Sequence, residues 1–315
     1  MTRDGDSVGS SAGNRGLVDD ATLALLLEVA GTPKPGNVDR HRDLGDLRFE
    51  SFLAGAVGAR AGLELAADEA VPVGRAFERG VAGMADRAGT NTQFGCLLLL
   101  VPLLRASAEG DLSPGGVDRV ARGTTVDDVV AFYEAFDRVD VAVSDPPPDA
   151  DDLDVRRGSD AVPALRDRGA TLRDVMALSA AGGADRVPDR NAQEWVEGFP
   201  RTFRAAEWIG TDDGPLTDSA ARAFLGLLAA EPDTLIAASH GPETAREASE
   251  RAAAVLGGET EGDEIDADAV HATDLTAAEE VAEAFVAEGI NPGTTADLTC
   301  AALYVALRRG AEVAP

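Results

Sequence analysis

The chain has 315 residues, 44% of them hydrophobic, and its 28 basic against 56 acidic residues give a formal net charge of −28. A surface this acidic repels phosphate backbones and anionic lipid headgroups, which argues against nucleic acid and membrane surfaces as partners. The hydrophobic fraction is large enough for a real core, and the most apolar run, residues 96–104, is about half the length that spans a bilayer. We therefore expect a folded protein of the cytoplasm.

The basic residues are almost all of one type, because 27 are arginine and only Lys34 is lysine. So many uncompensated carboxylates repel one another at ordinary salt, but at about 1 M salt the Debye length falls to about 3 Å and the charges are screened. A GC-rich genome also replaces lysine by arginine, yet it does not explain the excess of acid. The composition thus indicates adaptation to a concentrated-salt cytoplasm and predicts a loss of stability at low ionic strength.

Residues 1–16 are polar, rich in glycine and serine and without periodicity, so they predict a disordered tail and no signal peptide. Apolar residues then recur at helical spacing almost to the end of the chain. The first helix begins near residue 18 and ends at residues 31–36, where two prolines make a rigid turn. Further helices are expected at residues 49–67, 73–88, 92–108, 129–139, 171–181, 189–210, 216–230, 241–256, 274–288 and 294–309.

Strand signals are nearly absent, and residues 139–143 are the one short candidate. Residues 144–159 contain three consecutive prolines and a cluster of aspartates, and residues 257–268 are also acidic, so both are expected as solvated surface loops. Because helical periodicity resumes after each loop, neither marks a domain boundary. The sequence predicts one all-α domain over residues 17–315, folded as a multi-helix bundle.

The two cysteines and three histidines form no metal or nucleophile pattern. Cys96 and Cys300 lie far apart in apolar helical runs, where small buried thiols are expected. His41, His240 and His271 are separated and lack a Ser or Cys partner. The chemistry of the chain must therefore be sought in other residues.

The segment 28–40 combines polar residues with turn-formers in a way that a surface helix does not require. Lys34 stands between Pro33 and Pro35, and proline fixes its own φ and restricts the residue before it. The ammonium group is thereby expected on a stiff loop, aimed as a point charge at a phosphate. The alternative is the chance retention of one lysine.

Two further segments open helices with glycine, threonine and asparagine. Residues 88–96 precede the long apolar helix, and residues 289–298 precede the last helix, with Asp297 in its first turn. Backbone amides and hydroxyls at a helix N-terminus form an anion site, although an ordinary capped helix start has the same residues. Each segment alone is a weak signal.

Together the three segments resemble the triphosphoribosyl-dephospho-CoA synthase family. Its members carry Pro-Lys-Pro-Gly-x-Val-Asp near the start, Gly-x-Asn-Thr-His-x-Gly before a central apolar helix and Pro-Gly-x-x-Ala-Asp-Leu near the end. The same order stands here at residues 33–39, 89–95 and 292–298, and residues 175–180 and 194–199 are similar to archaeal members. The resemblance spans residues 23–308 and, with the composition, points to an archaeal, halophilic branch.

The resemblance implies an all-α transferase that moves the triphosphoribosyl group of ATP onto the 2′-hydroxyl of dephospho-CoA and releases adenine. A transition state that resembles an oxocarbenium ion benefits from a nearby carboxylate. The triphosphate needs cations, with Mg²⁺ as the expected cofactor, and the attacking hydroxyl needs a base. ATP and dephospho-CoA are thus the expected partners.

The family motifs also imply roles for single residues. Lys34 and Arg40 are expected to face the phosphates, and Glu28 to orient Lys34 from the preceding helix. The other expected substrate-binding residues are Pro35, Gly36, Asn37, Thr90, Asn91, Thr92 and Asn291.

The expected catalytic residues are three carboxylates and one amide. Asp39, Asp46 and Asp297 are candidates for the general base, and Asp39 and Asp46 are also the expected ligands of Mg²⁺. Gln93 stands at the position of the family's histidine in the central motif.

Two departures from the family pattern leave the substrate open. Gln93 replaces the histidine and Phe94 replaces a polar residue, and glutamine cannot carry a proton at neutral pH. Residues 41–46 align with the family's His-x-Asp-Met-Asp only after a one-residue slip, so Asp43 competes with Asp46. The alternatives are a same-fold enzyme acting on a different nucleotide or phospho-sugar, or a non-catalytic nucleotide-binding helical protein.

Overall fold

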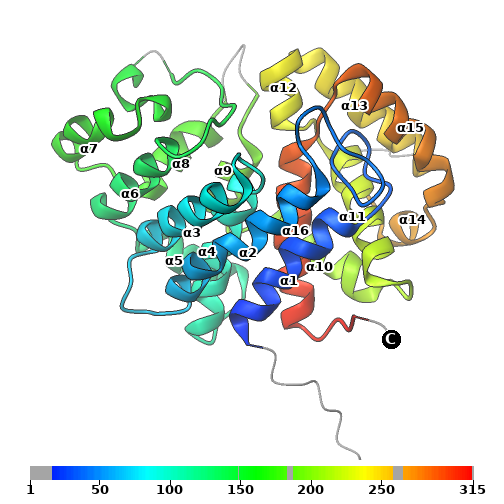
Figure 1. Cartoon of the computed structure of the whole chain (residues 1–315), viewed down its shortest axis with the longest axis horizontal. Helices are drawn as coiled ribbons and strands as arrows, with labels where there is room; N and C mark the ends of the chain where they lie inside the picture. Colours follow the sequence, from blue (N-terminus) through cyan, green and yellow to red (C-terminus); the bar gives the residue numbers. More distant parts are fainter. Residues whose placement is uncertain (1–15, 148, 183–186, 258–264, 314–315) are drawn as a thin grey trace, which may run out of the picture.

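The computed structural model describes residues 16–147, 149–182, 187–257 and 265–313. These residues form an all-α fold in which the only β pairing is two isolated bridges, Asp39 with Arg42 and Leu44 with Leu47. The predicted all-α fold is confirmed (Figure 1). The predicted tail lies outside the described residues except for Gly16, as do residues 258–264 of the second acidic loop.

The helices follow the apolar periodicity closely, and most boundaries agree with the sequence prediction within a few residues. Their bounds are α1 Leu17–Ala30, α2 Phe49–Ala66, α3 Val73–Ala88, α4 Phe94–Ala108, α5 Pro114–Arg122, α6 Val126–Phe136, α7 Val162–Arg168, α8 Leu172–Ala180, α9 Arg190–Glu197, α10 Pro200–Thr211, α11 Leu216–Ala230, α12 Thr234–His240, α13 Pro242–Val255, α14 Ala267–His271, α15 Leu275–Glu288 and α16 Gly293–Arg308. Two 3₁₀ helices, η1 Asp151–Leu153 and η2 Val155–Ala161, lie between α6 and α7.

The helix predicted over residues 189–210 is wrong as a single element, because it is broken into α9 and α10. Gly198 and Phe199 both adopt left-handed backbone conformations, with φ of 83° and 64°, and Pro200 then starts α10. The buried Glu194 carboxylate accepts the backbone N–H groups of Arg201 and Thr202 at 3.2 and 2.9 Å, so the bend is held from inside.

Other differences concern short elements. Four short helices, α5, α7, α12 and α14, were not expected, since five to nine residues contain too few helical periods to stand out. The predicted strand at residues 139–143 is wrong, because that segment joins no β ladder. Residues 144–159 are not purely a solvated loop, since they contain η1 and much of η2.

The core is built around α4 and α16. Both are apolar on nearly all sides and therefore buried, with residues 97–101 of α4 and 300–306 of α16 almost fully covered. Figure 1 shows α16 in the middle of the molecule, with α3–α8 on one side and α11–α15 on the other. In the described part of the chain, no helix combines the length and the apolar character needed to cross a membrane.

Glycines let two helices of the first half approach closely. A Cβ added at Gly62 of α2 would lie 2.4 Å from the Cα of Gly80 in α3, and one at Gly58 would lie 2.1 Å from the carbonyl oxygen of Gly83. The small-residue pattern of α2 therefore serves helix packing, as its spacing indicates.

Candidate active site

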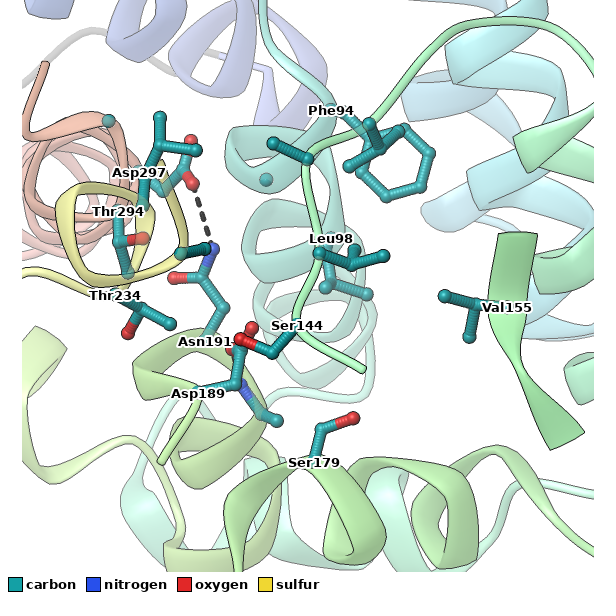
Figure 2. Close-up of a pocket in the computed structure, with 18 of the residues that line it drawn as sticks. Phe94, Leu98, Ser144, Val155, Ser179, Asp189, Asn191, Thr234, Thr294 and Asp297 are labelled. Atoms are coloured by element: carbon teal, nitrogen blue, oxygen red, sulfur yellow. Dashed lines mark hydrogen bonds between the residues drawn. The ribbon is translucent and has the colours of Figure 1, made fainter. Parts of the chain in front are cut away.

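The three sequence motifs line one cavity of about 400 Å³ between the ends of several helices (Figure 2). Figure 2 shows polar side chains on one side of the cavity and Phe94, Leu98 and Val155 on the other. Of the residues predicted from the sequence, those that line the cavity are Glu28, Asn37, Thr90, Asn91, Thr92, Asn291 and Asp297. Segments that are more than 250 residues apart in the chain thus share one site.

Asp297, in the second turn of α16 and not in the first turn as the sequence suggested, is a buried acid of the cavity. Its carboxylate accepts hydrogen bonds from Asn191 Nδ2 at 2.8 Å and from the Cys96 thiol at 3.3 Å. Both donors are neutral, and burial therefore raises the pKa of Asp297 to about 7, against the smaller lowering effect of the two hydrogen bonds. A carboxyl group with this pKa can both accept and release a proton near neutral pH.

The carboxylate of Asp297 lies directly against the first turn of α4. A Cβ added at Gly95 would stand 1.9 Å from Asp297 Oδ2 and 2.8 Å from Asn191 Nδ2. Only a glycine leaves room for this contact, so Gly95 of the second motif allows Asp297 of the third motif to take this position.

Lys34 is buried behind the cavity wall and does not line it. Its ammonium group forms an ion pair with Glu28 and donates to Asn37 Oδ1 at 3.1 Å. Asn37 in turn donates to Asn291 Oδ1 at 2.9 Å, which joins the first motif to the third. Burial raises the pKa of Glu28, and Lys34 opposes that rise. The lysine therefore orients two cavity residues, where the sequence predicted a lysine that faces phosphate.

Asp39 is also fully buried, but it belongs to the interior of the first loop. Its carboxylate accepts hydrogen bonds from Thr32 Oγ1 at 2.8 Å, Lys34 N at 3.2 Å and His41 N at 2.8 Å. The Arg42 guanidinium donates at 3.0 Å and supplies the opposite charge. Four donors thus saturate Asp39, and it does not line the cavity.

The remaining predicted residues of the first loop lie away from the cavity. Arg40 and Asp46 are exposed, while Pro35 and Gly36 are buried in the loop interior. Gly36 has a φ of 70°, and a Cβ there would lie 2.0 Å from the carbonyl oxygen of Ile290. These two residues therefore shape the contact between the first and third motifs.

Several cavity residues were not among the predicted site residues. They are Cys96, Asp189, Asn191, Thr234 and Thr294. Asn191 is a helical residue without a turn-former beside it, and only its neighbour Asp189, which caps α9 by accepting from Ala192 N at 2.8 Å, has a readable pattern. The hydrogen bond from Asn191 to Asp297 therefore could not be predicted from the sequence, because it depends on how the helices pack.

Asp233 connects the N-termini of α12 and α16. Its carboxylate accepts from Leu235 N at 2.8 Å, Ile236 N at 3.1 Å, and Thr295 N and Oγ1 at 2.7 Å each. Burial raises its pKa to about 6 even so. Because α16 carries Asp297 two residues after Thr295, this cap helps to place the carboxylate.

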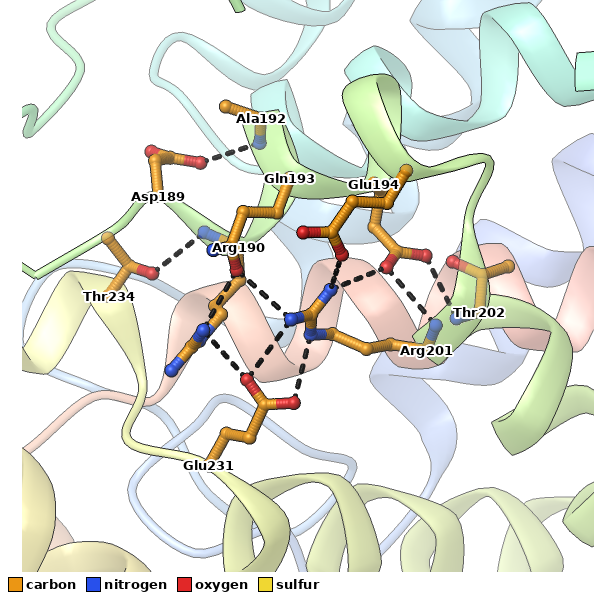
Figure 3. Close-up of polar contacts among 10 residues, drawn as sticks. Asp189, Arg190, Ala192, Gln193, Glu194, Arg201, Thr202, Glu231 and Thr234 are labelled. Carbon is orange, nitrogen blue, oxygen red and sulfur yellow. Dashed lines mark hydrogen bonds and ion pairs between the residues drawn. The ribbon is translucent and has the colours of Figure 1, made fainter. Parts of the chain in front are cut away.

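A network of charged side chains anchors α9 to its neighbouring helices (Figure 3). Glu231, just after α11, pairs with Arg190 at 2.8 Å and with Arg201 at 3.1 Å, and Arg201 also reaches Glu194 at 3.3 Å. The network ties α9 to α10 and to the end of α11. It fixes the helix that presents Asn191 to Asp297.

The match to a family model shows to which family the chain belongs. Residues 14–314 match the model of CitG, described as ATP:dephospho-CoA triphosphoribosyl transferase. The chain belongs to this family. Members of the CitG family transfer the triphosphoribosyl group of ATP to dephospho-CoA, and the protein is a transferase of this kind.

Solved structures agree with the fold of the CitG family. A crystal structure from Archaeoglobus fulgidus, described as that of a candidate triphosphoribosyl-dephospho-coA synthase, has a TM-score of 0.59 at 23% sequence identity. The match covers 81% of this chain and 97% of that chain. Among curated proteins, none matches.

The glutamine that replaces the CitG-family histidine lies inside a helix junction. Gln93 is 1% exposed, donates from Nε2 to the Leu25 carbonyl of α1 at 3.3 Å, and does not line the cavity. Its Oε1 would be 3.2 Å from a Cβ on Gly55 of α2. The side chain at position 93 is therefore not part of the cavity wall.

The expected Mg²⁺ has no preformed protein site in the described part of this CitG-family chain. No group of three His, Cys, Asp or Glu residues there could hold a metal ion. The expected ligand Asp39 is saturated by its four donors, and Asp46 is exposed outside the cavity. The described residues therefore do not fit a resident metal.

Proposed function

We propose that the cavity binds ATP and dephospho-CoA together, and that Asp297 is the general base. The 2′-hydroxyl oxygen of dephospho-CoA attacks C1′ of the ATP ribose, and its proton passes to Asp297. The bond from C1′ to the adenine nitrogen breaks, and adenine takes up a proton from solvent as it leaves. The observation that carries this proposal is a buried, cavity-lining carboxylate whose pKa is raised to about 7.

Negative charge around the cavity supports an oxocarbenium-like transition state. Glu28 and Asp297 both line the cavity, and the charge of Glu28 contributes to the raised pKa of Asp297. A positive charge that develops on the ribose is stabilised by two nearby carboxylates held in place by the fold. Glu28 is held by Lys34, and Asp297 by Asn191.

Neutral groups are the proposed ligands of the sugar and the phosphates. Amides of Asn37 and Asn291 and hydroxyls of Thr92 and Thr294 line the polar side of the cavity, and Thr92 Oγ1 is buried without a hydrogen-bond partner. The N-termini of α4 and α16 add backbone dipoles that favour anions. We propose that Mg²⁺ arrives already bound to the phosphates of ATP.

The test is direct. Purified protein is incubated with ATP, Mg²⁺ and dephospho-CoA in concentrated KCl, and free adenine is measured by chromatography, with Asp297→Asn as the control. We expect adenine release from the wild type that depends on dephospho-CoA. Equal release by both proteins would contradict the role of Asp297, and no release by either would contradict the reaction.

The alternative substrates are tested with the same protein. A thermal-shift panel of nucleotides and phospho-sugars would reveal a ligand other than ATP as the one that stabilises the fold most. We expect ATP to give the largest shift. We also propose that the protein acts in the cytoplasm, where ATP is available.

A further inference from the structure

The cavity has an apolar half that the proposed chemistry does not use. Its walls come from α4, α6 and α8 together with residues 141–144, 146, 147, 150 and 153–155. Leu98, Val143, Val155 and Met176 line this half, and Figure 2 shows Leu98 and Val155 well apart from Asp297. A ligand part that contacts this half must be largely uncharged, because burial of a charge against aliphatic walls is costly.

The aromatic rings of this half are already packed against one another. Phe94 meets Phe136 edge to face with ring centroids 4.9 Å apart, and Phe132 meets Phe136 at 5.2 Å. Phe94 and Phe132 are only 6% and 3% exposed, so they offer little open ring surface to stack on a purine. The accessible walls are aliphatic, which suits a flexible chain better than a flat base.

One wall of the apolar half is an extended segment with free backbone groups. Residues 139–147 belong to no helix or strand and are anchored where Asn91 Nδ2 donates to the Asp140 carbonyl at 3.1 Å. Within the described residues, the backbone groups of 141–144 have no hydrogen-bond partner in the protein. Every residue of 141–144 lines the cavity. Such an edge pairs with an extended, amide-containing ligand.

We propose that the apolar half and the edge of residues 141–144 bind the uncharged arm of dephospho-CoA. This inference rests on the proposed function. The arm is a long aliphatic chain with two secondary amides, so its methylene and methyl groups fit the aliphatic walls and its amides fit the free backbone groups. The nucleotide end of the same molecule then lies on the polar side, where its 2′-hydroxyl reaches Asp297. The segment 139–147 is therefore the element that recognises the acceptor.

The experiment places one charge on this wall and measures both substrates. Val143→Asp is compared with Val57→Asp, which changes a valine that is 51% exposed on α2 and outside the cavity. We expect Val143→Asp to raise the KM for dephospho-CoA at least tenfold and to change the KM for ATP less than twofold. Val57→Asp should change neither. An equal rise in both KM values would overturn the inference.

Pantetheine, the arm without its phosphates, is the probe that needs no turnover. Calorimetry should show that it binds the wild type and Val57→Asp equally, and Val143→Asp at least tenfold more weakly. If the wild type releases no adenine, the proposed function fails, but this titration still decides the inference. Equal binding by all three proteins, or none by the wild type, would overturn it. If Val143→Asp melts at a lower temperature, Val155→Asp, on η2, replaces it with the same expected results.

Discussion

Asp39 and Asp297 are both buried carboxylates of family motifs, and their surroundings separate their roles. Asp39 accepts four hydrogen bonds, one of them from the charged Arg42, and is enclosed by its own loop. Asp297 accepts two hydrogen bonds, both from neutral donors, and lines the cavity. Arg42 forms an ion pair with Asp39, and the four donors around this carboxylate hold the loop together. Both donors to Asp297 are neutral, and burial raises its pKa to about 7, so it can exchange a proton near neutral pH.

This difference shows that burial and motif membership do not by themselves mark a catalytic acid. The hydrogen-bond partners decide, and those of Asp297 come from other parts of the chain. Asp39 finds Arg42 three residues away, whereas Asp297 finds Asn191 on α9 and Cys96 on α4. Four substitutions and one change of solvent test whether the two carboxylates differ in this way.

Replacing Asp297 by Asn should have the largest effect on activity. The amide keeps the size of the side chain but cannot accept the proton, so we expect adenine release to fall about 10²–10⁴-fold. The measurement is kcat with both substrates saturating. Asp46→Asn, at an exposed position outside the cavity, should retain full activity.

The same variant should gain stability at alkaline pH. The folded state raises the pKa of Asp297 from 3.8 to about 7, so between these pH values the folded protein holds a proton that the unfolded chain has lost. Stability therefore falls as pH rises through this window, and Asn removes that penalty. Asp297→Asn should melt above the wild type at pH 8 and close to it at pH 4, and an equal difference at both pH values would contradict the assignment.

Replacing Asp39 by Asn should act on stability instead. Removing the charge breaks the ion pair with Arg42, which then keeps its ion pair with Glu279, and disturbs four hydrogen bonds, so we expect a loss of about 2–3 kcal/mol in the free energy of unfolding. Urea unfolding measures it. If the folded variant instead lost activity without a loss of stability, Asp39 would belong to the chemistry.

Replacing Gly95 by Ala should displace the catalytic carboxylate. The added Cβ would stand 1.9 Å from Asp297 Oδ2, so that side chain must move away. We expect kcat to fall roughly tenfold or more, because small misplacements of a reacting group are costly. Gly210→Ala in α10, where a Cβ meets nothing within 4 Å, is the matched control and should keep wild-type activity.

Replacing Asn191 by Leu should move the pH profile. Activity of the wild type should rise with pH through about 7, because the base must be ionised. The Asn191 hydrogen bond lowers the pKa of Asp297, so its loss should shift the rising limb to higher pH. A profile that shifts to lower pH, or stays in place, would show that Asp297 is not the group observed.

Salt concentration should change the melting temperatures of the wild type and of Asp297→Asn almost equally, which is the smallest expected difference. Concentrated KCl should raise the melting temperature of the wild type, because the net charge of −28 is screened. Asp297→Asn should respond in parallel, since a buried carboxylate is screened much less than surface charges. An unchanged wild-type melting temperature between dilute buffer and concentrated KCl would contradict the salt-adapted interpretation.

The all-α class, most helix positions and the membership in the CitG family could be predicted from the amino-acid sequence. Helical periodicity and caps are local patterns, and short motifs survive as strings of residues. Asp297, Asn37 and Asn291 were predicted site residues for that reason, and they do line one cavity.

The contacts that these residues make could not be predicted in the same way. Helix packing buries Lys34 behind the cavity wall, brings Asn191 and Cys96 to Asp297, and places residues 141–144 along the cavity where a strand or a solvated loop was expected. The physical reason is that a side chain's partner, and hence its charge state, depends on how distant helices pack. No local pattern records that packing.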